Sequence, residues 1–166
     1  MRPDWLPDKL VLNGTLPEIY ETLYEYYQAE IESEEIIVEG VPVIHNNVVD
    51  RHNPPYTYGF THLITREVSV NLRSYDQNRA EKLSWVVPLL KNYKDPNVSC
   101  FWFETPRGLT IIDSLAIWLE EMDFILILRW HDFSRTQKVV VTAHSIDSGN
   151  RNYWQRKRRK SSSRIL

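Results

Sequence analysis

This sequence contains a single cysteine, Cys100, and no apolar run long enough to cross a bilayer. One cysteine excludes an internal disulfide and fits the reducing environment of the cytoplasm. The longest apolar runs, such as 124–128, fall far short of the roughly 20 residues that a membrane-spanning helix needs. The segment 1–12 carries prolines and charges where a secretory signal would need an apolar core. We therefore expect a cytoplasmic protein without a membrane partner.

Several motifs of enzyme chemistry are also missing. The histidines show neither HxH nor HExxH spacing, which disfavours a zinc site. There is no G-x-x-x-x-G-K or G-x-G-x-x-G loop for a nucleotide and no G-x-S-x-G turn for ester hydrolysis. We expect no metal and no cofactor.

What the chain does have is a folded composition and an uneven charge. Its 166 residues are 42% apolar and include 6 Trp, 9 Tyr and 5 Phe, which predicts one domain with a real core. Residues 1–150 carry 13 Lys and Arg against 22 Asp and Glu, whereas 151–166 carry 7 Lys and Arg and no acid. A basic end on an acidic body favours a polyanionic partner such as nucleic acid, although a solvated tail has the same composition.

Local patterns predict two helices before the main sheet. Thr15 and Glu18 form a capping box, and apolar residues at helical spacing follow, so we expect a helix over 16–32. Segments 36–38 and 41–44 flank Glu39-Gly40 and predict a hairpin, followed by a loop over 46–58. A short apolar segment over 59–65 and a connection over 68–74 precede a second helix over 75–87, which Pro88 should end or kink.

The pattern then changes from helix to strand. Four strands are expected over 98–104, 109–119, 124–130 and 137–146, and their short connections favour an antiparallel meander. Asp147-Ser148 is a suitable cap for a closing basic helix. The expected fold is therefore α+β: an N-terminal helical portion packed on a four-stranded antiparallel sheet and closed by a basic helix. The single domain 1–166 divides into 1–58 (helix, hairpin, loop), 59–147 (helix and sheet core) and 148–166 (basic helix or tail).

Candidate residues for chemistry occur in a fixed order along these segments. Cleavage of RNA by its own 2′-hydroxyl needs a base, an acid and cations for the phosphate. His62 and His144 suit the proton transfers, while Arg79 and Lys82 suit the phosphate. Alternation in the last strand predicts one shared face, comprising Lys138, Val140, Thr142 and His144. Each residue also has a structural interpretation, such as a packed histidine or an exposed Arg79–Glu81 pair.

In this order the motifs resemble the phage-associated nucleases of the Barnase–EndoU–colicin–RelE class. Members often carry Gly-Phe-x-His-Leu, then a helix reading Arg-x-Glu-Arg-Ile-x-Trp-x-x-Pro, then strands leading to Thr-Ala-Tyr and a basic helix. The corresponding segments here are 59–63, 79–88, 142–144 and 150–160, and the likeness spans nearly the whole chain. The positions that match are His62, Arg79, Glu81, Lys82, Trp85 and Thr142. Two departures are Lys82, where arginine is usual, and His144, where tyrosine is usual.

The resemblance implies an endoribonuclease of phage or toxin type that forms a 2′,3′-cyclic phosphate without a metal. His62 is the expected base or acid, with His144 as its partner. Glu81 is expected to orient a cation, and Thr142 to donate a hydrogen bond. RNA is the expected partner, together with a cognate inhibitor or antitoxin protein. The residues expected to bind RNA are Lys138, Arg151, Arg156, Lys157, Arg158, Arg159 and Lys160. The alternative is a non-catalytic module on the same fold that binds RNA or protein.

Overall fold

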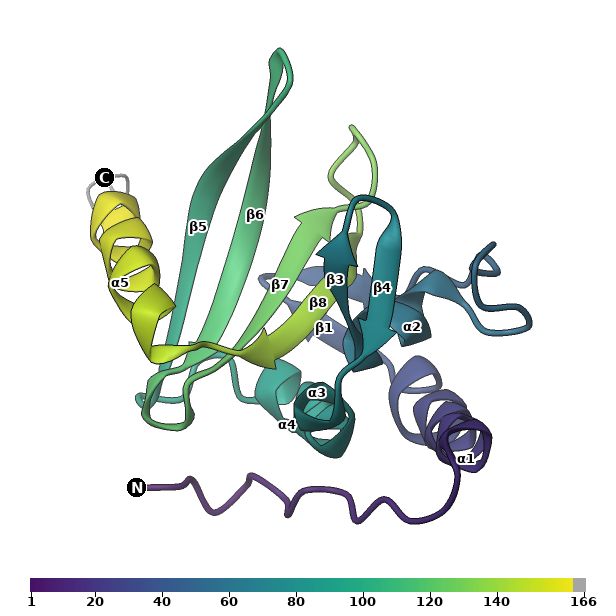
Figure 1. Cartoon of the computed structure of the whole chain (residues 1–166). Coiled ribbons are helices and arrows are strands. Elements are labelled where there is room, and N and C mark those ends of the chain that lie inside the picture. The colour runs from purple at the N-terminus through teal and green to yellow at the C-terminus, as the bar shows by residue number, and fades with distance from the viewer. Residues whose placement is uncertain (163–166) are drawn as a thin grey trace.

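The computed structural model describes residues 1–162 and has an α+β fold. Within these residues, six strands form one mixed sheet and two more form a separate hairpin (Figure 1). The strand order in the large sheet is β1-β2-β8-β7-β6-β5. Its strands are β1 (Ile36–Val38), β2 (Val41–Ile44), β5 (Val98–Arg107), β6 (Thr110–Leu119), β7 (Phe124–Trp130) and β8 (Lys138–Ser145).

The four strand segments expected after residue 97 are present as β5 to β8. Each pairs antiparallel with the next, because their connections are too short for a parallel crossover. The expected four-stranded antiparallel sheet is nevertheless incomplete, because the β1–β2 hairpin extends it. Val43 of β2 lies opposite Lys138 of β8 in a parallel pairing. This pairing makes the sheet mixed, and no local pattern in the sequence predicts it.

A bulge in β8 changes which side chains share a face. Ile127 of β7 lies opposite Thr142 and Leu128 lies opposite Val140, so Val141 has no partner in the register. The extra residue reverses the alternation of side chains. Lys138 and Val140 therefore face the helical side of the sheet, whereas Thr142 follows Ile127 to the other face. The expected shared face of Lys138, Val140, Thr142 and His144 is wrong for this reason.

Short helices cover one face of the sheet and position the candidate residues. The first, α1 (Leu16–Tyr27), has the expected capping box and continues as a π-helical turn over Gln28–Glu32, so the helix expected over 16–32 is confirmed. The expected helix over 75–87 is wrong. Its segment is divided into α3 (Gln77–Glu81), a 3₁₀ turn (Leu83–Trp85) and α4 (Val86–Lys91). Pro88 lies in the first turn of α4, where its missing N–H removes no helical hydrogen bond.

The segment expected to be a short apolar stretch and a connection is regular structure. It forms α2 (Tyr58–Ile64) and a hairpin of β3 (Thr65–Ser69) and β4 (Leu72–Tyr75). This hairpin and α2 lie beside β8 where β2 no longer covers it (Figure 1). The second half of β8 is therefore the edge at which α2, α3 and the hairpin meet the sheet.

The closing basic helix is α5 (Ser148–Ser162), and it lies on the opposite face of the sheet (Figure 1). Trp154 of α5 packs edge-on against Phe103 of β5, with ring centroids 5.2 Å apart. Residues 163–166 of the expected closing segment lie outside the described residues. Over residues 1–162, the helices are all too short or too polar to traverse a bilayer.

Candidate functional site

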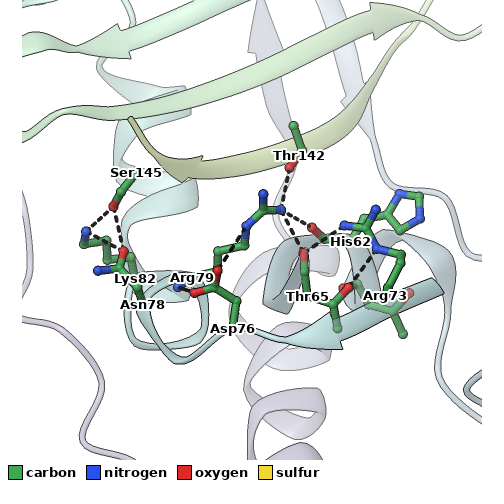
Figure 2. Close-up of polar contacts among 10 residues, drawn as sticks. His62, Thr65, Arg73, Asp76, Asn78, Arg79, Lys82, Thr142 and Ser145 are labelled. Atoms are coloured by element: carbon green, nitrogen blue, oxygen red, sulfur yellow. Dashed lines mark hydrogen bonds and ion pairs between the residues drawn. The ribbon is translucent and has the colours of Figure 1, made fainter. Parts of the chain in front are cut away.

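Arg79 occupies the junction between α2, α3, β3 and β8. Asp76 caps α3 by accepting a hydrogen bond from the Arg79 amide at 3.1 Å, and its carboxylate also lies 3.9 Å from Arg79 Nε. One terminal nitrogen of Arg79 donates to the Thr65 carbonyl at 2.8 Å and to Thr142 Oγ1 at 3.2 Å (Figure 2). It also lies 3.4 Å from the carbonyl oxygen of His62. Two candidate residues, Arg79 and Thr142, therefore meet, and in this contact Thr142 accepts the hydrogen bond, whereas it was expected to donate one. Burial lowers the pKa of the Arg79 guanidinium.

Lys82 forms a second polar contact between α3 and β8. Its Nζ donates to Asn78 Oδ1 at 2.8 Å and to the Ser145 hydroxyl, which itself donates to Asn78 at 2.7 Å (Figure 2). Lys82 is buried and lies over the Trp85 ring, 5.3 Å from its centroid. Burial lowers the pKa of its amine. Lys82 thus holds the end of β8 against α3 rather than pointing into solvent.

A cavity opens directly beside these two contacts, and we call it the His144 cavity. Its volume is about 390 Å³. It is lined by Arg66, Asp76, Asn78, Arg79, His144, Ser145 and Asp147. Two arginines, an imidazole and a hydroxyl are among the groups that line this cavity. Arginines can bind a phosphate, and an imidazole can transfer protons next to it.

The imidazole of His144 has an unused hydrogen-bonding atom. Its Nδ1 is buried and has no partner within the described residues. Burial lowers the pKa of His144 to about 4, with the nearby Arg79 charge acting in the same direction. The ring is therefore neutral at neutral pH and can accept a proton.

His62 lies in a different cavity, which we call the His62 cavity. Its volume is about 640 Å³, and its lining shares no residue with that of the His144 cavity. It is lined by Asp50, His52, Asn53, Tyr58, His62, Glu67, Asn71, Leu72, Arg73 and Arg107. The His62 ring packs edge-on against Tyr58, and burial, followed by the Arg73 charge, lowers its pKa. The expected pairing of His62 with His144 therefore lacks a common cavity.

Glu81 and Lys138, two other residues expected in the site, do not make the contacts expected of them. Glu81 accepts a hydrogen bond from Gln77 at 2.8 Å, and Asp76 and Asn78 make the cation contacts expected of it. Lys138 is fully buried: its Nζ donates to the Val38 carbonyl at 2.9 Å and lies 4.5 Å from the centroid of the Trp130 ring. A nucleic acid has no access to such a cation, so the expected role of Lys138 in RNA binding is wrong.

The basic helix divides into cations that hold it in place and cations that face outward. Arg151 pairs with Asp123, and Arg158 pairs with Glu120. Lys157 donates to the Glu104 carbonyl at 2.9 Å. The side chains of Arg156, Arg159 and Lys160 are exposed. Of these six cations, Arg156, Arg159 and Lys160 are the ones whose side chains are exposed enough for the expected contacts with RNA.

Several residues of the site escaped the sequence pattern. Asp76 carried a signal, because an aspartate directly before a helix is a typical N-cap. Asn78 and Ser145 carried none, since they are 67 positions apart and meet only in the folded chain. Arg66 was hidden in the β3–β4 hairpin, which the sequence did not predict.

Comparisons with known proteins do not assign this chain to a family. No family model, no curated protein and no solved structure matches the chain. Among residues 1–162, no three His, Cys, Asp or Glu side chains are grouped so that they could hold a metal ion.

Proposed function

We propose that this chain is an endoribonuclease that cleaves RNA through the 2′-hydroxyl, with its site in the His144 cavity. The observation that supports this proposal most directly is that Arg79, His144 and Ser145 line one cavity, where α3 meets the second half of β8. The order of the motifs supports placing the chain with the Barnase–EndoU–colicin–RelE nucleases. The antiparallel succession β5 to β8 and the basic helix α5 support the same placement.

Three groups in the cavity have a role in this chemistry. The imidazole of His144 takes the proton of the 2′-hydroxyl, and the resulting alkoxide attacks the adjacent phosphorus. Arg79 and Arg66 donate to the phosphate oxygens, on which negative charge increases in the transition state. The bond from phosphorus to the 5′-oxygen breaks, and that oxygen takes a proton from water. The products are a 2′,3′-cyclic phosphate and a 5′-hydroxyl.

The low pKa of His144 in the free protein is consistent with a site that binds an anion. In the free protein, burial and Arg79 favour the neutral imidazole. A bound phosphodiester brings negative charge next to the ring, and an opposite charge within a few ångströms raises the pKa of an imidazole. Substrate binding would therefore raise the pKa of His144, so that the ring keeps the proton that it removes from the 2′-hydroxyl.

The test is incubation of purified protein with total RNA in excess EDTA, with the cleavage ends identified. Wild type should leave cyclic-phosphate ends, and His144→Gln should not. His131→Gln is the matched control, because His131 lies exposed in the loop between β7 and β8. Binding of RNA without cleavage by folded wild type would favour the non-catalytic module instead.

A further inference from the structure

Two further cavities continue from the His144 cavity along α5. The first is about 250 Å³ and shares His144, Ser145 and Asp147 with it. Its other lining residues are Ile146, Asn150, Tyr153 and Trp154. The second is about 380 Å³ and is lined by Tyr153, Arg156, Lys157 and Lys160. Because neighbouring cavities share lining residues, the three lie in succession from the proposed cleavage site to the cations of α5.

Tyr153 stands where the last two cavities meet, since it lines both. It is 39% exposed, while its neighbour Trp154 packs against Phe103 and holds the helix to the sheet. The two aromatic rings lie nearly perpendicular, at 85°. The Nζ of Lys157 also lies over the Tyr153 ring, 5.4 Å from its centroid. Tyr153 therefore offers a partly exposed ring on a fixed support with a cation beside it, and such a ring can stack an unpaired base next to its phosphate.

The chemistry of the smaller cavity also suits a nucleobase. The amide of Asn150 and the carboxylate of Asp147 lie at the same opening as the Tyr153 ring. These polar groups can bind the edge of a base while the ring covers its face. The cavity is below the range of about 300–1,000 Å³ typical of drug-sized pockets, so one planar group is a suitable occupant.

We propose that the cavity of Asn150 and Tyr153 is a subsite for an unpaired nucleobase, placed next to the phosphate bound by Arg79. Arg156 and Lys160 then contact the phosphates that follow along α5. The identity of the ligand as nucleic acid rests on the proposed function. A base stacked on Tyr153 has left its duplex, so the subsite selects single-stranded segments.

Binding of short 2′-deoxy oligonucleotides tests this subsite without any cleavage, because DNA lacks the attacking hydroxyl. The probes are a single strand with bases and an abasic strand of equal length. Wild type should bind the strand with bases about tenfold more tightly, as expected for one stacked base. Tyr153→Ala should remove this preference and leave abasic binding unchanged, while Tyr153→Phe should keep it.

Two variants serve as matched controls. Phe133→Ala removes an exposed aromatic ring in the β7–β8 loop, and Asn152→Ala removes an exposed side chain from α5 outside these cavities. Both should keep the preference for bases. A preference that survives Tyr153→Ala, or its absence in wild type, would overturn the subsite. Failure of wild type to cleave RNA would overturn the enzyme while leaving this result standing.

Discussion

The His62 and His144 cavities contain the same kinds of group but differ in which of those groups have hydrogen-bond partners. In the His62 cavity, the buried Asp50 accepts hydrogen bonds from Thr61, Asn53 and the His52 amide. Arg73 there donates twice to Thr65. In the His144 cavity, Arg79 and Ser145 are engaged as well, but the buried Nδ1 of His144 has no partner among the described residues. The comparison teaches that the histidine of a conspicuous motif and the proposed base can lie in separate cavities.

The largest expected effect separates the two histidines in catalysis. His144→Ala should lower kcat/KM for RNA cleavage by about 10²- to 10⁴-fold, because it removes the proposed base. His62→Ala should lower it less than about tenfold, since that ring lines the other cavity. Cleavage rates in EDTA, measured below the melting temperature of both variants, decide this. A larger loss in His62→Ala would reverse the comparison.

The next contrast concerns stability rather than activity. Asp50→Ala should destabilise the protein by about 3 kcal/mol, because Thr61 and the other donors lose a buried charged acceptor. Asp147→Ala should cost less, about 1 kcal/mol, because its side chain is exposed and stabilises the fold only from the position before the first residue of α5. Urea unfolding of both variants measures the difference. Equal losses of unfolding free energy would mean that Asp50 and Asp147 stabilise the fold to the same extent.

Acid should destabilise the fold through His144. Its folded pKa is about 4 against 6.5 for the free side chain, so between these values the unfolded chain binds a proton that the folded chain does not. Stability attributable to His144 is thus complete above about pH 6.5 and falls as the pH drops toward 4, by up to about 3 kcal/mol.

His144→Gln should remove this part of the acid sensitivity, and urea unfolding at about pH 7 and about pH 4.5 would measure it. His45 is the internal reference. Burial lowers its pKa to about 4 as well, and its contribution remains in the variant. An unchanged difference in stability between the two pH values would show that folding does not lower the pKa of His144.

The smallest effect should appear in the salt dependence of RNA binding. Arg156→Ala should reduce the slope of log K against log salt by about 0.7, the value for one phosphate contact on a single strand. Arg107→Ala, in the lining of the His62 cavity, should leave the slope unchanged. Affinity titrations at several salt concentrations test both. An effect of Arg107 alone would place the RNA at the His62 cavity instead.

The sequence predicted those elements whose cause is local. The capping box and the apolar spacing in α1 act within a few residues, and so do the short turns between β5 and β8. The broken helix after Tyr75 was missed because a helical apolar spacing is compatible with two short helices joined by a tight turn. The pairing of β2 with β8 depends on packing between distant segments, which no local pattern encodes.

The candidate site was predicted in part for the same reason. Arg79 and Thr142 were both named as candidates, but their contact across 63 positions is visible only in the folded chain. The burial of Lys138 depends on Val38, Trp102 and Trp130, each from a different strand, so its polar type alone was misleading. The bulge at Val141 decided which residues of β8 share a face, and alternation counted along the sequence cannot detect one extra residue.

The edge position of β8 has a consequence for the growing chain. Synthesis proceeds from the N-terminus, so α3 with Arg79 leaves the ribosome well before Thr142 and His144 exist. Until β8 joins β7 and meets α3, neither the His144 cavity nor the parallel pairing with β2 can form. Closing such long-range contacts is slow compared with forming helices. If the proposed function holds, a nascent copy is inert beside the RNA that encodes it, and cleavage begins only after β8, one of the last strands to be made, has joined the sheet.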